Sequence, residues 1–154
     1  MSETREITLT LNGARLRRRV PVRQHLADFL RISEGLTGTH VGCEQGVCGA
    51  CTVRLDGAIV RGCLVLAVQA DGAIVDTIEG VSDSGELARL QKEFLERNAL
   101  QCGFCTPGML LSAAALLAAN PRPSRDEIRA HLSGNYCRCT GYHAIIDAVE
   151  AASR

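Results

Sequence analysis

The chain has 154 residues, which is long enough for one domain or two small ones, and 46% of them are hydrophobic. Aromatic residues make up only 3% of the chain, so its core must be built from aliphatic side chains. The 17 basic and 17 acidic residues cancel, which argues against a nucleic-acid-binding protein and against a disordered chain.

Cysteine is the residue type that stands out, with eight in the chain. A chain of this length can bury a core without disulfides. Residues 1–6 are polar and charged with no apolar segment after them, and the longest apolar run, 109–119, is too short to cross a membrane. We therefore expect a cytoplasmic protein without a membrane span, in which clustered cysteines bind metal more often than they form disulfides.

The first half of the chain has the pattern of a small sheet with one helix. Apolar and polar residues alternate over 7–11, a turn is predicted at Asn12-Gly13, and a returning strand ends at Pro21. Residues 25–30 then have the apolar spacing of a helix.

A second hairpin is predicted over 52–60, with its turn at Asp56-Gly57. The short apolar segment 63–69 fits either a strand or a helix, and 73–75 is predicted as a last strand. Two hairpins, one helix and a last strand indicate a small α+β sheet with one covering helix.

The second half has the pattern of helices. Ser82–Ser84 offers an N-cap for a helix whose apolar residues lie between 87 and 95. Pro107 at a first helical position, with Thr106 as its cap, predicts the start of another helix. That helix is apolar on all sides over 109–119, so it should be buried.

Two more helices complete the expected elements of the second half. Ser124 and Glu127 have the spacing of a capping box, and a last helix is predicted over about 143–152. Four helices suggest a compact bundle. We place the domain boundary near 78–84 and divide the chain into a first domain, residues 1–80, and a second, residues 81–154.

The first four cysteines have the spacing of an iron–sulfur site. Cys43-x4-Cys48-x2-Cys51, followed by Cys63, is the plant-type order for a [2Fe–2S] cluster. Glycines alternate with these cysteines, and they allow the loop to fold closely around a cluster and to direct backbone N–H groups at sulfur.

The other four cysteines form two pairs, Cys102-x2-Cys105 and Cys137-x-Cys139. A C-x-C pair is unusual for zinc, which favours C-x2–4-C knuckles. Both pairs precede expected helix starts, and the positive N-terminal end of a helix stabilises an anionic cluster. By spacing alone, this second quartet is a less specific signal than the first.

Other interpretations of the eight cysteines fit less well. Two zinc sites match the ligand count, but the spacing departs from the usual symmetric pairs. Disulfides are rare in a reducing compartment, and isolated buried cysteines do not explain two quartets. The four histidines are scattered, so we expect surface or capping roles for them and not a metal site; they are His25, His40, His131 and His143.

Three long segments, 42–53, 101–109 and 134–142, resemble a known family. They are similar to the cluster-binding segments of the small iron–sulfur subunit of molybdenum hydroxylases, the xanthine oxidase and aerobic carbon monoxide dehydrogenase family. The segments occur in the family's order, and the resemblance extends from about Ile7 to Ala151.

The resemblance implies an N-terminal β-grasp ferredoxin-like domain and a C-terminal four-helix bundle domain. It implies one [2Fe–2S] cluster in each, with ligands Cys43, Cys48, Cys51 and Cys63 in the first and Cys102, Cys105, Cys137 and Cys139 in the second. It further implies that Gln101 and Cys139 lie beside molybdopterin, which is held by a large partner subunit, and that a medium partner subunit holds FAD.

We therefore expect an electron-transfer subunit of a molybdenum-containing oxidoreductase, with no catalytic residue of its own. Electrons would pass from the molybdenum centre through the second cluster and then the first to FAD or another acceptor. Two alternatives stay open: a free-standing [2Fe–2S] ferredoxin or redox-sensing module, and a zinc-stabilised interaction module. No nucleic-acid partner is expected.

Overall fold

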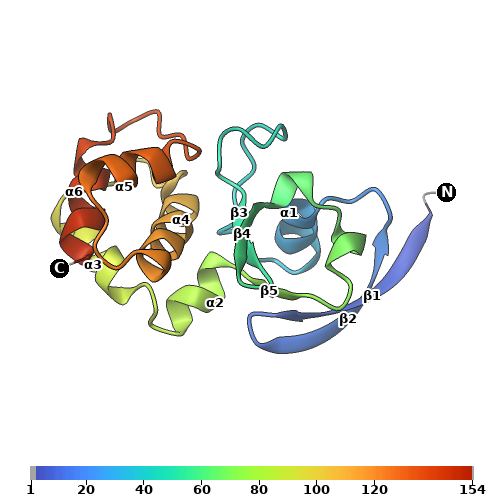
Figure 1. The fold of residues 1–154 in the computed structure, drawn as a ribbon. Helices are drawn as coiled ribbons and strands as arrows, with labels where there is room; N and C mark the ends of the chain where they lie inside the picture. The colour runs from blue at the N-terminus through green and yellow to red at the C-terminus, as the bar shows by residue number, and fades with distance from the viewer. Residues whose placement is uncertain (1–2, 154) are drawn as a thin grey trace.

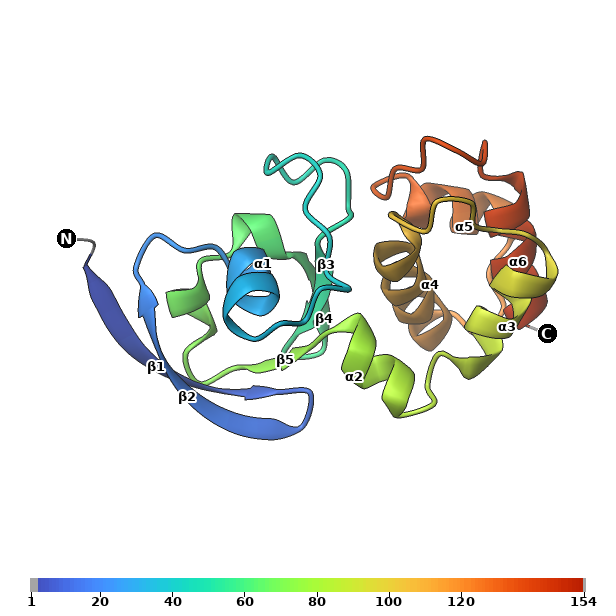
Figure 2. The ribbon, with the colours of Figure 1, turned by 180° about the vertical axis from the view of Figure 1, so that it is seen from behind.

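The computed structural model describes residues 3–153 and places a five-stranded sheet beside a group of helices (Figures 1 and 2). Residues 1, 2 and 154 lie outside the described part. The first two belong to the polar segment 1–6, so the structure describes only residues 3–6 of that segment. This arrangement of a sheet followed by helices confirms the predicted α+β class. No helix within residues 3–153 is both long and apolar enough to cross a membrane.

The sheet has the strand order β2-β1-β5-β3-β4. Strands β1 and β5 are parallel, and the other neighbours are antiparallel. Both predicted hairpins form, and their turns lie at Asn12-Gly13 and Asp56-Gly57. The strands are β1 Thr4–Leu11, β2 Ala14–Pro21, β3 Thr52–Leu55, β4 Ala58–Arg61 and β5 Ile74–Asp76.

One face of the sheet packs on the predicted helix, which is irregular. It begins as α1 (Leu26–Asp28) and continues as a π-helical turn, η1 (Phe29–Ser33). His25 caps it, because its Nδ1 atom accepts the Asp28 N–H at 3.0 Å. The buried side chains between helix and sheet include Leu26, Phe29, Leu30, Ile7, Leu9, Val53 and Val75.

The segment that fitted either a strand or a helix forms two short 3-10 helices, η2 (Gly62–Leu64) and η3 (Ala67–Ala70). Between them, His25 and Leu66 form an isolated β-bridge. The segment therefore returns along the start of α1 and carries Cys63 to the first cysteine loop.

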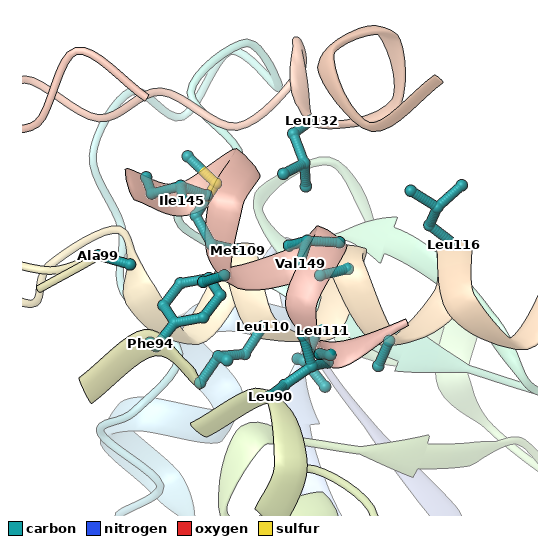
Figure 3. Close-up of a cluster of buried hydrophobic side chains, with 14 of the residues drawn as sticks. Leu90, Phe94, Ala99, Met109, Leu110, Leu111, Leu116, Leu132, Ile145 and Val149 are labelled. Carbon is teal, nitrogen blue, oxygen red and sulfur yellow. The ribbon is translucent and has the colours of Figure 1, made fainter. Parts of the chain in front are cut away.

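The second half contains a buried helix, α4, with the others around it. Phe94 of α3, Met109 of α4 and Ile145 of α6 point into the same core (Figure 3). Helix α4 is the one predicted to be apolar on all sides, and most of its residues are buried. The helices are α2 Ile78–Asp83, α3 Ala88–Glu96, α4 Thr106–Ala119, α5 Arg125–Leu132 and α6 His143–Ala152.

Two helix starts differ from the prediction. Ser82–Ser84 lies at the end of α2 rather than at the start of α3, because Val81 is buried in the helical core and Ser84 Oγ donates to the Val81 carbonyl at 2.8 Å. Thr106 is the first residue of α4 and not its cap, since the backbone of Cys105 is already helical and accepts the Met109 N–H.

The remaining helix signals are confirmed. Ser124 and Glu127 form the expected capping box at the start of α5, with each side chain accepting the other residue's backbone N–H. The last helix spans the predicted residues.

Candidate metal centres

The first cysteine loop, residues 42–51, rises from the sheet on the side that faces the helical half (Figures 1 and 2). Its turns place Glu44, Gly46 and Gly49 at positive φ, at 52°, 80° and 73°. Such angles cost little only at glycine. A Cβ atom on Gly46 would also meet the exposed side chain of Leu64, so a larger residue there would have to displace that side chain as well as strain the backbone.

Backbone N–H groups point at the sulfur of Cys43. The amides of Gln45 and Cys48 lie 3.4 and 3.5 Å from it. These hydrogen bonds lower the pKa of the Cys43 thiol to about 6, because they stabilise the thiolate. The loop is therefore shaped to hold a thiolate, which is the form that binds metal.

The other two cysteines of this quartet are buried. Cys63 donates its backbone N–H to the sulfur of Cys51 at 3.4 Å. Burial, together with the neighbouring Cys63 thiol, raises the pKa of the Cys51 thiol to about 11, although the Cys63 backbone N–H partly opposes this. A buried thiolate needs a cation to compensate its charge, so the environment of these two side chains favours binding of a metal such as iron.

The second quartet comes from two separate segments. Cys102 and Cys105 precede α4, and Cys137 and Cys139 precede α6. The sulfur atoms of Cys102 and Cys139 are 3.5 Å apart and both residues are exposed. The thiols of Cys105 and Cys137 are also in contact, and both are half-buried.

The two inner thiols of this quartet differ in pKa. Burial and, to a smaller extent, the Cys137 thiol beside it raise the pKa of Cys105 to about 12. Burial also raises the pKa of Cys137, but the Thr140 hydroxyl, 3.1 Å from its sulfur, and backbone N–H groups outweigh it and lower the pKa overall. This quartet therefore also combines a buried thiol with a thiol prepared as a thiolate.

The cysteines of each quartet meet as pairs. Within residues 3–153, no group of three or more His, Cys, Asp or Glu side chains is placed to share a single metal ion. The paired thiols instead are Cys43 with Cys48, Cys51 with Cys63, Cys102 with Cys139, and Cys105 with Cys137. Four thiolates in two pairs are the donor set that a two-iron cluster requires.

Gln101 lies beside the exposed pair of the second quartet. Its side-chain Nε2 donates to the backbone carbonyl of Cys139 at 3.1 Å. The structure therefore brings together the two residues predicted to contact a pterin. It also gives Gln101 a role within the chain that the sequence did not suggest, since the bond joins the segments before α4 and α6.

The structure adds residues between the two quartets that sequence reasoning missed. The Tyr136 N–H donates to the Cys48 carbonyl at 2.8 Å, and Asn135 is buried against the first cysteine loop. His40 stacks on Phe104 with ring centroids 4.6 Å apart, and its Nδ1 lies 2.7 Å from the Phe104 carbonyl oxygen. Phe104, Asn135 and Tyr136 lie inside the three segments that resemble cluster-binding segments, and this position was the one signal in the sequence that could have pointed to them. His40 lies outside these segments.

Comparison with known proteins agrees with this arrangement. The sequence matches two protein families, described as a 2Fe-2S iron-sulfur cluster binding domain over residues 9–73 and a [2Fe-2S] binding domain over residues 77–150. It is 53% identical to the nicotine 6-hydroxylase small subunit of Paenarthrobacter nicotinovorans, covering 96% of this chain and 89% of that protein. It is 42% identical to the xanthine dehydrogenase iron-sulfur-binding subunit of Escherichia coli O157:H7, covering 96% and 94%.

The chain belongs to the small iron–sulfur subunits of the molybdenum hydroxylases. It is thus a subunit of an oxidoreductase that carries [2Fe–2S]-binding domains.

Solved structures of this family have the same fold. Quinoline 2-oxidoreductase from Pseudomonas putida 86 contains a chain that is 55% identical, with a TM-score of 0.93, covering 99% of this chain and 95% of that one. The aldehyde oxidoreductase of Desulfovibrio gigas matches with a TM-score of 0.89 and 45% identity, covering 97% of this chain but 17% of that chain. In that longer protein, the iron–sulfur subunit corresponds to one part of a single polypeptide.

Proposed function

We propose that this chain holds two [2Fe–2S] clusters and carries electrons from a molybdopterin centre in a large partner subunit to FAD in a medium subunit or to another acceptor. The observation that carries this proposal is the arrangement of all eight cysteines as two quartets, each made of two thiol pairs. Each iron of such a cluster would take the two thiolates of one pair.

The residues present fit a cluster at each quartet. When bound, a [2Fe–2S] cluster accepts and releases one electron at a time. The backbone amides of Gln45 and Cys48 would stabilise negative charge on the first cluster through Cys43, and the Thr140 hydroxyl would do so on the second through Cys137. Hydrogen bonds to sulfur and burial set the potential, so the two clusters should differ in potential.

The exposure of the two quartets supports an order for them. Cys102 and Cys139 are exposed together with Gln101, so this edge is open to a pterin on a partner chain, whereas Cys51 and Cys63 are buried. A glutamine side chain both donates and accepts hydrogen bonds, which suits the ring nitrogens of a pterin. We therefore propose that electrons enter at the second quartet and leave from the first.

The substrate of the whole enzyme belongs to other chains. The similar small subunits come, by their names, from enzymes that act on nicotine, caffeine and xanthine. One kind of small subunit thus accompanies different substrates, as expected if it makes no contact with them. We place the protein in the cytoplasm, because a reducing compartment keeps eight cysteines available as ligands.

A division into two domains, residues 1–80 and 81–154, is part of this proposal. Two separate hydrophobic clusters support it, one between sheet and α1 and one among the helices. The division falls inside α2, which connects them.

Metal and sulfide analysis tests the proposed function. The purified protein should be brown, with about four iron atoms and four acid-labile sulfides per chain, and reduction should give two distinct electron paramagnetic resonance (EPR) signals. A colourless protein that holds zinc would contradict it. A chain that carries both clusters but never co-purifies with larger subunits would favour the free-standing ferredoxin.

A further inference from the structure

A buried amide joins the two cysteine sites. Asn135 is only 2% exposed, and its Nδ2 atom donates to the Gly49 carbonyl at 3.2 Å and lies 3.4 Å from the Thr52 hydroxyl. Its Oδ1 atom accepts the Ser112 hydroxyl of α4 at 2.9 Å. One side chain of the second half therefore contacts both the first cysteine loop and the helix that follows Cys105.

Arg61 strengthens this contact from the opposite side. It lies on β4, and its Nη2 donates to the Gly134 carbonyl at 2.7 Å while its Nη1 donates to the Thr52 hydroxyl. The guanidinium group is planar and holds its two acceptors in a fixed geometry. Thr52 thus receives hydrogen bonds from both halves of the chain.

The residue after Asn135 links the two quartets directly. The Tyr136 N–H donates to the Cys48 carbonyl at 2.8 Å, and Tyr136 is bonded to Cys137. A short path of covalent bonds and one hydrogen bond therefore runs from a ligand of the first site to a ligand of the second. This hydrogen bond depends on the orientation of the 134–136 segment relative to the first cysteine loop.

The backbones of the two halves are in close contact in this region. A Cβ atom on Gly49 would lie 2.5 Å from the Gly134 carbonyl oxygen, and one on Gly108 would strike the Gly49 carbonyl. In any shifted packing, the amide of Asn135 would lose its partners while still buried, which is costly. A buried polar group of this kind favours a single arrangement over its alternatives.

We propose that Asn135, together with Arg61, is a positioning residue that fixes the distance and the hydrogen-bonded path between the two clusters. This rests on the proposed function, since it requires a cluster at each quartet. In the step concerned, one electron leaves the reduced cluster of the Cys102 quartet and enters the oxidised cluster of the Cys43 quartet. No bond forms or breaks and no proton moves, and Asn135 acts only through the segments that it holds.

Asn135→Ala tests this in the protein purified with its partner subunits. The magnetic interaction between the two reduced clusters, measured by EPR, falls steeply with distance, so it should weaken or broaden. Hydrogen exchange at the Tyr136 amide should become about tenfold faster, the size expected when a buried hydrogen bond that holds it is lost. Inter-cluster electron transfer after rapid reduction should slow.

Two further variants make the result interpretable. Arg61→Lys keeps the positive charge but loses the fixed two-acceptor geometry, so it should change the same readouts in the same direction by less. Asn12→Ala is the matched control. The Asn12 amide also makes two hydrogen bonds to a distant residue, Thr77, at 3.0 and 2.8 Å, but away from both quartets.

The proposal holds if the magnetic interaction and Tyr136 exchange change in Asn135→Ala and Arg61→Lys but not in Asn12→Ala. It is overturned if Asn135→Ala and Asn12→Ala behave alike, because Asn135 would then contribute only stability. Should Asn135→Ala fail to assemble clusters, an unchanged interaction in Arg61→Lys overturns it. A wild-type protein with about two iron atoms per chain and one EPR signal would instead contradict the proposed function. Iron analysis of the wild-type protein therefore distinguishes failure of the proposed function from failure of this inference.

Discussion

The two cysteine sites are built by different means. Three cysteines of the first come from a single loop and the fourth from the neighbouring η2 turn, so its geometry depends on local backbone conformation. The second takes one pair from the segment before α4 and the other from the segment before α6. It therefore exists only when the helices pack correctly.

Their surroundings differ as well. In the first site the pair Cys51 and Cys63 is buried, while in the second the pair Cys102 and Cys139 is exposed. The site that depends most on tertiary structure is thus also the one most open to a partner. The first site therefore depends mainly on one loop and the turn beside it, whereas the second depends on how α4 and α6 pack.

The largest effect should come from removing one ligand. Cys48→Ala should reduce the iron content from about four atoms to about two and abolish one EPR signal, because only one quartet loses its cluster. The reciprocal variant, Cys105→Ala, should abolish the other signal. Loss of both signals in Cys48→Ala would show that the quartets are not independent.

The next effect concerns the contact between the sites. Gly49→Ala places a side chain at a φ of 73° and within 2.5 Å of the Gly134 carbonyl oxygen, so it should both strain the backbone and separate the two halves. The positive φ alone costs about 1–2 kcal/mol. The total loss of unfolding free energy, measured by urea denaturation, should exceed that.

Gly57→Ala is the matched control for Gly49→Ala. Gly57 has a φ of 82°, but no atom lies within 4 Å of the position its Cβ would take. It should therefore lose only the backbone part of the free energy and keep its full iron content. Equal losses in the two variants would mean that the contact between the halves adds nothing.

The difference between the sites also explains what the sequence could predict. The spacing of Cys43, Cys48 and Cys51 is local, and hairpin turns and helix caps depend on adjacent residues, so most of the elements were predicted correctly. The spacing of the two later pairs did not by itself predict that they form one site, and only the resemblance to a family did so. The reason is that Cys105 and Cys137 meet through helix packing, which adjacent residues do not reveal. The ligand assignments themselves stay predictions until iron is measured.

Other features had no local signal. The residues next to Asn135 and Arg61 in the sequence do not indicate that Asn135 contacts the Gly49 carbonyl or that Arg61 contacts the Gly134 carbonyl, because such contacts depend on how the two halves dock. The start of α3 was misplaced for the same reason. Polar residues at 82–84 fit a helix beginning as well as a helix end, and burial of Val81 in the helical core decided between them.

A smaller effect is expected at the exposed edge of the second site. Gln101→Ala removes the hydrogen bond to the Cys139 carbonyl, which should cost the isolated subunit about 0.5–1.5 kcal/mol of unfolding free energy. If the amide also binds the pterin, a buried partner left unpaired costs about 1–3 kcal/mol, which is about tenfold or more in pterin affinity. Molybdenum content, or electron transfer from molybdenum measured by rapid mixing with substrate, should then fall.

Gln45→Ala is the control, since Gln45 is also exposed but contacts the first site through its backbone N–H and not its side chain. It should leave electron entry unchanged. If Gln101→Ala leaves both electron transfer and molybdenum content unchanged, Gln101 has only its role within the chain.

The smallest effect should arise at an exposed ion pair outside the two quartets, where Arg54 of β3 and Glu86 of the second half make a two-point contact at 2.6 and 3.1 Å. The hydrogen bond to Arg54 lowers the pKa of Glu86. A carboxylate with a lowered pKa stabilises the fold above its unfolded-state pKa and loses that contribution as pH falls through the folded-state pKa.

Glu86→Gln should therefore cost about 0.2–1 kcal/mol of unfolding free energy at neutral pH, the range for exposed pairs, and nothing at a pH below the lowered pKa. Urea denaturation over that pH range measures the difference, with Glu96→Gln as the control for losing an exposed ion pair, to Lys92, within a single helix. A cost that persists in acid would mean that Glu86 stabilises the contact between the halves by packing and not by charge.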